Sequence, residues 1–276
     1  MNCCMPFFKS RNSNQVEKRA LLVGINYRGT SGELHGCIND INNIKSLLLK
    51  NGYKEENIRM MSDDHKELPT KHKIAMGLIW LMENTKNKNM ELFFHYSGHG
   101  SWVYDKNGDE KDNRDECLVP IDYKRNGMLY DDDIKSLVED NLTSNSKLFC
   151  IIDACHSGTM IDLKYNLMVS KVDKTESKIN TEFKLETHNY EGTIKGQVIV
   201  ISGCEDTQTS ADAWLDRKSQ GALTHSFSET MRNNNYELDF ETLMTGVYQI
   251  VKQNNFTQNP TLSSNKTIVL ENKVVV

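Results

Sequence analysis

Two short segments, each an apolar run that ends in a glycine-containing turn, constrain the fold of this chain most strongly. They are Phe93-Phe94-His95-Tyr96-Ser97-Gly98-His99-Gly100 and Cys150-Ile151-Ile152-Asp153-Ala154-Cys155-His156-Ser157-Gly158. Short apolar runs bounded by turn residues are typical of strands buried on both faces of a parallel sheet. As neighbours in one sheet, these strands would bring His99 and Cys155 together at its carboxyl edge, where open α/β sheets bind their ligands.

The rest of the chain predicts alternating strands and helices. Strands are expected over 19–25, 57–61, 90–96, 118–121, 148–153, 197–202 and 267–270, and helices over 38–49, 74–82, 132–138, 221–231 and 240–251. This alternation indicates a doubly wound α/β fold with helices on both faces of the sheet. Residues 160–195 are polar and lysine-rich with little periodicity, so they are predicted to form a long exposed connection. Residues 1–18 are expected to form a short flexible segment and 19–276 a single domain.

Composition excludes several functional classes. A net charge of −5 argues against general binding to nucleic acid, which needs a strongly basic face. No apolar run approaches the roughly 18 residues of a membrane span, and the N-terminal residues lack the apolar core of a signal peptide. The seven cysteines are an odd number without a spacing pattern, which favours free thiols over disulfides. We therefore expect a soluble cytoplasmic protein with no nucleic-acid partner and no membrane span.

The histidine and the cysteine suggest nucleophilic catalysis. A cysteine becomes an effective nucleophile when a neighbouring base takes its proton, and His99 is the candidate base for Cys155. The backbone N–H groups of Gly100 and Cys155 are candidates for stabilising a developing oxyanion, as acyl transfer at a carbonyl requires. Taken singly, a buried cysteine is more often an inert core residue and a histidine at a strand end a satisfied polar group. The occurrence of both residues beside glycines, after predicted parallel strands, favours the catalytic interpretation.

Several segments resemble the signatures of the metacaspases, the caspase-like cysteine peptidases of plants, fungi, protists and some viruses and bacteria. The segments are 96–100, 153–158 and 202–212, together with residues 19–40, which resemble the family's first strand and helix. The match keeps the family's order to the C-terminus, and the short linker is nearer to the type I members. The resemblance implies a caspase-hemoglobinase fold with a mainly parallel sheet of six to eight strands. It also implies a large-subunit-like part over 19–159, a linker over 160–195 and a small-subunit-like part over 196–276, with His99 as base and Cys155 as nucleophile.

The resemblance further implies cleavage of protein or peptide substrates after Arg or Lys. Asp40 and Asp153 match the family's acidic S1 positions, with Cys37 and Ser97 beside them. Carboxylates there would give a basic P1 side chain charge-assisted hydrogen bonds and would repel a P1 Asp. In the alternative interpretation, Asp40 caps or pairs on a helix surface and Asp153 only orients the turn at Cys155.

Metacaspases commonly need calcium, and no organic cofactor is implied. Acidic residues stand at all four positions that bind the ion in the family, and these are Asp115, Asp131, Asp132 and Asp162. Hard carboxylate oxygens from several loops suit a calcium site. Four clustered carboxylates would repel one another without a cation, whereas acids scattered on a solvated surface would need none.

An enzyme of this specificity would find cleavable lysines in its own linker. The candidate autoprocessing sites are Lys164, Lys171, Lys174 and Lys178. The alternative role of these lysines is to keep an exposed loop soluble. Self-processing within 160–195 is therefore a hypothesis.

A monomer is expected, because no exposed apolar edge for caspase-style dimerisation is visible near the last predicted strands. Two rival functions stay open at this stage. One is a legumain-like or paracaspase-like peptidase with a different P1 preference, which a peptide panel would distinguish. The other is a scaffold or regulator that keeps the fold without turnover, for which Cys155→Ala would leave every effect intact.

Overall fold

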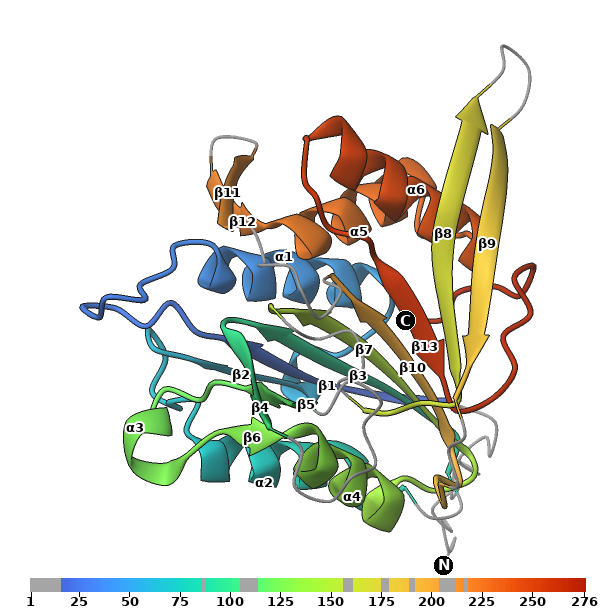
Figure 1. The fold of residues 1–276 in the computed structure, drawn as a ribbon. Coiled ribbons are helices and arrows are strands. Elements are labelled where there is room, and N and C mark those ends of the chain that lie inside the picture. The colour runs from blue at the N-terminus through green and yellow to red at the C-terminus, as the bar shows by residue number, and fades with distance from the viewer. Residues whose placement is uncertain are drawn as a thin grey trace, which may run out of the picture.

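A single sheet of eight strands lies between two layers of helices in the computed structural model (Figure 1). The described residues are 16–85, 88–104, 114–155, 161–174, 179–188, 192–203, 212–215 and 218–276. The strands of this sheet are β1 (Glu17–Gly24), β2 (Ile58–Ser62), β3 (Met90–Ser97), β7 (Ser146–Asp153), β8 (Tyr165–Lys174), β9 (Ile179–Thr187), β10 (Gln197–Ser202) and β13 (Thr261–Ser264). Their order is β2-β1-β3-β7-β10-β13-β8-β9, and the first five are parallel while the last three pair antiparallel. This arrangement confirms the predicted α/β class and mainly parallel sheet.

The helices divide between the two faces of the sheet. On one face lie α1 (Cys37–Lys50), α5 (Ala222–Asn233) and α6 (Phe240–Gln253), and on the other lie α2 (Lys71–Met82) and α4 (Asp131–Asn141) (Figure 1). The described ranges also contain two short helices, η1 (Glu55–Asn57) and α3 (Tyr123–Asn126). Side chains cap two of the helices, because Thr70 accepts from the Lys73 N–H at the start of α2 and Asp239 accepts from the Thr242 N–H at the start of α6. None of the helices in the described ranges has the length and apolar character needed to cross a membrane.

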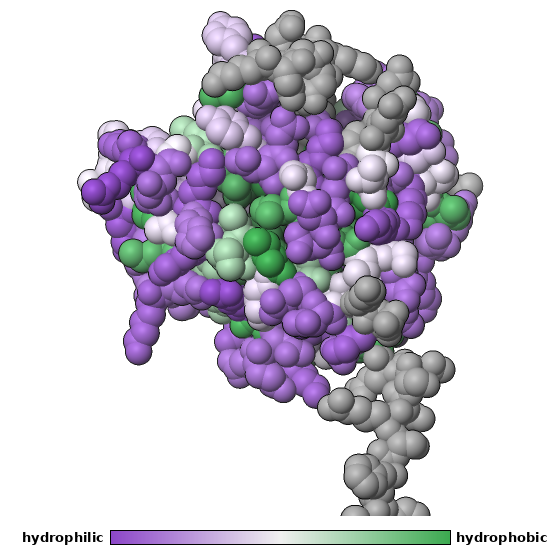
Figure 2. All heavy atoms as spheres, turned by 90° about the horizontal axis from the view of Figure 1, so that it is seen from below, coloured by the Kyte–Doolittle hydropathy of each residue, from purple (hydrophilic) through white to green (hydrophobic). Residues whose placement is uncertain are grey.

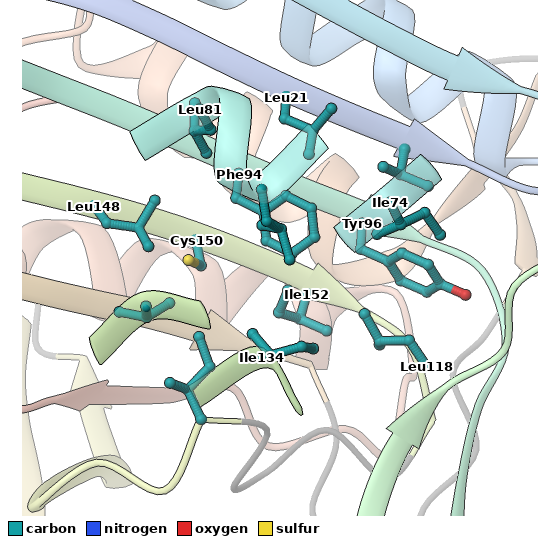
Figure 3. Packing of buried hydrophobic residues seen from close by; sticks show 14 of the residues in the cluster. Leu21, Ile74, Leu81, Phe94, Tyr96, Leu118, Ile134, Leu148, Cys150 and Ile152 are labelled. Atoms are coloured by element: carbon teal, nitrogen blue, oxygen red, sulfur yellow. The ribbon is translucent and has the colours of Figure 1, made fainter. Parts of the chain in front are cut away.

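The central strands are buried on both faces, which explains their continuous apolar sequences. In β3, Phe94 and Tyr96 pack in the cluster with α2 and α4, while Phe93 packs in the cluster with α1 and α5. Figure 3 shows the first cluster, where Phe94 and Cys150 of the sheet lie among side chains of the covering helices. Seen from the side of α2 and α4, the outer surface is mostly hydrophilic around a limited hydrophobic area (Figure 2).

Two small sheets extend from the main sheet. One contains β4 (Gly100–Tyr104), β5 (Arg114–Leu118) and β6 (Leu129–Tyr130), and the other is the hairpin of β11 (Asp212–Leu215) and β12 (Lys218–Gly221). Strand β4 begins three residues after the end of β3, and β12 runs directly into α5. Both small sheets therefore adjoin the carboxyl edge of the parallel strands.

Three sequence predictions about secondary structure are wrong in part or whole. The stretch 160–195 is not simply an exposed connection, because β8 and β9 form an antiparallel hairpin within the main sheet. Leu167 and Val169 of β8 are buried at every second position, a strand period that the surrounding lysines and polar residues obscure.

The last strand is β13, and residues 267–270 are not a strand. The sequence Thr-Leu-Ser-Ser of β13 has a weak apolar signal, but its hydroxyls are satisfied inside the sheet. Ser202 and Thr261 hydroxyls lie 2.6 Å apart, and Ser264 donates to the Val198 carbonyl at 2.8 Å. The strand expected over 118–121 shares only Leu118 with an observed strand, because Leu118 is the last residue of β5 in a small sheet.

Candidate active site

The register of β3 and β7 brings the two signature segments together. These strands are parallel neighbours, and Ser97 pairs with Asp153 at the end of both. His99 and Cys155 each lie two residues beyond this pair. The approach is close, because a Cβ built on Gly100 would lie 1.8 Å from the Cys155 carbonyl oxygen. Only glycine permits this contact, which explains the residue type directly after His99.

The imidazole of His99 is oriented by groups that the sequence did not reveal. Its Nε2 lies 2.7 Å from the Gly32 carbonyl oxygen, which can only accept, so Nε2 carries the proton and Nδ1 keeps the lone pair. The His99 backbone N–H donates to the Tyr27 hydroxyl at 3.0 Å, and the Tyr27 ring centroid lies 4.7 Å from that of the imidazole. Tyr27 in turn donates to the Val119 carbonyl at 2.6 Å. These contacts fix the tautomer and the position of the ring.

Cys155 differs from the other described cysteines in its exposure. Cys37, Cys117 and Cys150 are buried, while Cys155 is partly exposed. Burial raises the pKa of the Cys150 thiol well above its usual range, and burial with nearby carboxylates raises the pKa of Cys117 to about 12. Both of those thiols are protonated and inert at neutral pH. Cys155 is therefore the described cysteine best placed to react with a substrate.

Two buried carboxylates lie on the α1 and α5 side of this edge. Asp40 is 0% exposed and Asp153 is 2% exposed. The Ser97 hydroxyl donates to Asp40 at 2.7 Å, the Gly221 N–H donates to both Asp40 oxygens at 3.0 Å, and the Thr224 N–H donates to Asp153 at 2.8 Å. A Cβ on Gly221 would lie 2.1 Å from an Asp153 oxygen and 2.9 Å from an Asp40 oxygen, so the two acids converge there. Asp40 is therefore buried and does not lie on the helix surface, where the alternative interpretation placed it.

The start of α1 and the strand β12 enclose the acid pair. Cys37 lies at the first position of α1, where its N–H donates to the Asn26 side chain at 3.1 Å. From the next turns of α1, Asn39 donates to the Ser219 carbonyl at 2.9 Å and Asn43 donates to the Gln220 side chain at 2.8 Å. Sequence reasoning missed Gly221 and these asparagine contacts, because β12 is about 180 residues from α1 and has no apolar pattern of its own.

The four predicted calcium ligands lie on or near β5, α4 and the turn before β8. Asp131 is 2% exposed, and its carboxylate accepts from the backbone N–H groups of Glu116 at 3.0 Å and Asp132 at 2.8 Å. Burial and the negative charges of Asp162 and Asp132 raise the pKa of Asp131 to about 7. Asp132 and Asp162 therefore lie near enough to Asp131 to act on its carboxylate electrostatically.

The acids are not assembled into a coordination shell in this conformation. Within the described ranges, no group of three or more His, Cys, Asp or Glu side chains is arranged to hold a metal ion. The Lys135 ammonium lies 3.3 Å from an Asp162 oxygen and neutralises part of the local charge. Oxygen donors crowded enough to repel one another fit a hard divalent cation, provided that Lys135 yields its position.

The candidate autoprocessing lysines differ in their surroundings. Lys164 is exposed directly before β8, whereas Lys171 lies inside the β8–β9 ladder and pairs with Asp173 at 2.7 Å. Lys174 is the last residue of β8. Lys178 lies outside the described residues, as does most of the signature segment 202–212.

Comparison with known proteins identifies the family. A family model described as "Metacaspase, peptidase C14 domain" matches residues 18–164, which include both His99 and Cys155. Metacaspase-1 of Mycosarcoma maydis is 31% identical over 302 residues, covering 96% of this chain and 74% of the relative. Metacaspase-2 of Arabidopsis thaliana is 35% identical over 252 residues, covering 86% of this chain and 58% of the relative.

A solved structure supports the fold independently. The crystal structure of a Geobacter sulfurreducens protein superposes with a TM-score of 0.64 at 20% identity, covering 93% of this chain and 97% of that one. At this identity the likeness shows the fold alone. The family assignment rests on the family model, which matches more than half of the chain, and on the curated relatives. The chain belongs to the metacaspases and is a cysteine-type endopeptidase.

Proposed function

We propose that this metacaspase cleaves peptide bonds after Arg or Lys, with Cys155 as nucleophile and His99 as base. The observation that carries the proposal is the buried acid pair, Asp40 and Asp153, which converges on Gly221. Asp153 lies two residues before Cys155 along the chain. Carboxylates that converge on one point offer several acceptor oxygens to a cationic side chain. The geometry thus favours a substrate that carries its own positive charge.

The electrostatics of the acid pair support a basic P1 side chain. The Ser97 hydroxyl donates to Asp40, the Gly221 N–H donates to Asp40, and the Thr224 N–H donates to Asp153, so these neutral donors orient the two carboxylates. A guanidinium or ammonium group would gain charge-assisted hydrogen bonds there. A P1 carboxylate would meet like charge and be rejected.

The proposed reaction uses the imidazole twice. His99 Nδ1 takes the Cys155 thiol proton, and the thiolate attacks the scissile carbonyl carbon. The N–H groups of Gly100 and Cys155 stabilise the oxyanion, and His99 then gives its proton to the leaving amine. Water, deprotonated by His99, hydrolyses the resulting thioester to the acid and free thiol. The Gly32 carbonyl stabilises the imidazolium that forms in both halves of the reaction.

Calcium is the proposed activator, held by the carboxylates of Asp115, Asp131, Asp132 and Asp162. The raised pKa of Asp131 supports this proposal, because it reflects burial of that carboxylate and, next, the negative charges of Asp162 and Asp132, both of which a divalent cation would offset. When bound, the ion would supply positive charge that holds β5, α4 and the turn at Asp162 together. Lys135 must release Asp162 for all four acids to take part.

Self-processing in the linker is the last element of the proposal. Lys164 is the favoured described site, because it is exposed and lies outside the strand ladder. Cleavage at Lys171 would require the β8–β9 pairing to open. An extended substrate must leave its own sheet before it can enter an active site.

A panel of P1 peptides tests the proposal. Wild-type and Cys155→Ala proteins are compared on peptides with Arg, Lys, Asn or Asp at P1, with calcium or a chelator, while self-cleavage is followed on a denaturing gel. We expect calcium-stimulated hydrolysis after Arg and Lys that disappears in Cys155→Ala. Cleavage after Asn or Asp would contradict the S1 assignment, and indifference to the chelator would contradict the calcium site. Folded wild-type protein that cleaves none of the peptides would contradict the proposed mechanism.

A further inference from the structure

The hairpin that follows His99 carries an aromatic group that the proposed reaction does not use. The Trp102 and Tyr104 rings of β4 are arranged edge to face, with centroids 5.4 Å apart at 86°. The Arg114 guanidinium of β5 lies 4.2 Å from the centroid of the Trp102 ring, in a cation–π contact. Tyr104 is 76% exposed, and Trp102 is partly exposed. We call Trp102, Tyr104 and Arg114 the aromatic hairpin group.

The direction of Gly100 places this group on the side of Cys155. A Cβ on Gly100 would point at the Cys155 carbonyl oxygen, 1.8 Å away. The β4–β5 ladder is regular from Gly100↔Leu118 to Tyr104↔Arg114, with no register shift. Because alternate residues of a strand share one side, Trp102 and Tyr104 stand on the side that Gly100 presents to Cys155. They lie about 7 and 14 Å from Gly100 along the strand.

The aromatic hairpin group and the acid pair flank Cys155 from opposite faces of the sheet. Asp40 belongs to α1, and the groups that hold the acids belong to β12 and α5, on one face. The sheet β4–β5–β6 lies on the other face, with α2 and α4 (Figure 1). When the P1 side chain of a substrate binds at the acid pair, the hairpin side of Cys155 therefore stays available to other residues of the substrate.

His99 decides which part of the substrate meets the hairpin. In the proposed reaction His99 protonates the leaving amine, so the residues after the scissile bond start beside His99. Strand β4 begins at Gly100, the next residue. An extended peptide advances about 3.3 Å per residue, so its first and second residues after the bond span the distance from Gly100 to Trp102.

We infer that Trp102, with Arg114 stacked on its ring, forms a primed-side subsite for an apolar or aromatic side chain at P1′ or P2′. This inference rests on the proposed function and adds a second specificity determinant to it. The indole offers apolar and aromatic contact area. An apolar side chain gains this contact without losing hydration of a charge, whereas Lys or Arg would lose it, so the enzyme selects a basic residue before the scissile bond and an apolar residue after it.

Two kinds of substrate separate the subsite from the rest of the site. One is a short peptide with P1 Arg joined to an aminocoumarin, which has no primed residues. The others are internally quenched peptides that share P1 Arg and differ only at P1′ and P2′, which are Leu-Phe, Gly-Gly or Lys-Lys. The variants are Trp102→Ala and Trp102→Phe. Tyr248→Ala is the matched control, because Lys252 lies 5.4 Å from the centroid of the Tyr248 ring on α6.

We expect wild-type kcat/KM to be about five- to tenfold higher for the Leu-Phe peptide than for the Lys-Lys peptide. Trp102→Ala should erase this preference, mainly through a higher KM, while hydrolysis of the aminocoumarin substrate stays within about twofold. Trp102→Phe should restore part of the preference, and Tyr248→Ala should keep all of it.

Three results would overturn the inference. They are a wild type without primed-side preference, a Trp102→Ala variant that keeps it, and an equal loss on both substrate types accompanied by a lower melting temperature. The last result would assign Trp102 a structural role. Failure of the proposed function would give a different result, because the wild type would then not cleave the aminocoumarin substrate after Arg at all. In that case the primed-side inference would fail together with the proposed function.

Discussion

Substitution of Gly100 by Ala tests the closest contact between the two signature segments. An alanine Cβ would lie 1.8 Å from the Cys155 carbonyl oxygen and 3.2 Å from the Ala154 Cβ, whereas ordinary contacts begin at 3.4 Å. The obstructing atom is backbone and cannot rotate away, so the segments must separate by about 1.6 Å. A misplacement of about 1 Å between reacting groups can cost about 100-fold in rate. We therefore expect kcat for a P1 Arg substrate to fall at least about 100-fold.

The assay is steady-state hydrolysis by Gly100→Ala and by Ser101→Ala, with thermal unfolding of both. Ser101 is the next residue of β4 and points to its other side, so this control tests whether the strand tolerates alanine. We expect near wild-type activity from Ser101→Ala and a folded Gly100→Ala protein with little activity. Activity of Gly100→Ala within about fivefold of wild type would refute the claim that this contact positions the catalytic groups.

Three further substitutions test the surroundings of the site. His95 is fully buried, and burial lowers its pKa from 6.5 to about 4. Between pH 6.5 and pH 4, this histidine therefore binds a proton in the unfolded chain but stays neutral in the folded chain. Stability is therefore lost as the pH falls from 6.5 towards 4. Between pH 7 and pH 5, the free energy of unfolding measured with denaturant should fall by about 2 kcal/mol more for wild type than for His95→Leu. Equal decreases in the two proteins would contradict this. Gly32→Ala should lower kcat about three- to tenfold, because the alanine Cβ would lie 3.2 Å from His99 Nε2 and displace the imidazole ring. A variant with an unchanged kcat and an unchanged pH–rate profile would contradict this expectation. Lys135→Gln should raise calcium affinity about fivefold in a titration followed by melting temperature, because it removes a competing cation from Asp162; weaker binding would show that Lys135 supports the site.

The strands that carry His99 and Cys155 were predictable because their signal is local. Each is a continuous apolar run that ends in a turn, and neighbouring parallel strands align their carboxyl ends. The surroundings of Asp40 were not predictable in the same way. Sequence alone left Asp40 open between a surface cap and a buried acid, because its partner Gly221 lies 181 residues away.

The order of the last strands was equally out of reach. β13 has only one strongly apolar residue, Leu262, and it inserts between β10 and β8 through backbone and hydroxyl hydrogen bonds. The hairpin β8–β9 buries one side only, so its lysines and polar residues concealed the alternation at Leu167 and Val169. Long-range pairing, rather than local propensity, decides both features.

The strand order also determines whether the two pieces of a self-cleaved enzyme would stay together. Unlike a cut after Lys164, which precedes β8, a cut between Lys174 and Ile179 would divide the chain into an N-terminal piece that ends with β8 and a C-terminal piece that begins with β9. In the sheet, β8 lies between β13 and β9 of the second piece, while β10 of the second piece lies against β7 of the first. The two pieces would remain an interlocked heterodimer, joined by three strand ladders. Such an enzyme would run as two bands on a denaturing gel and as one particle in solution.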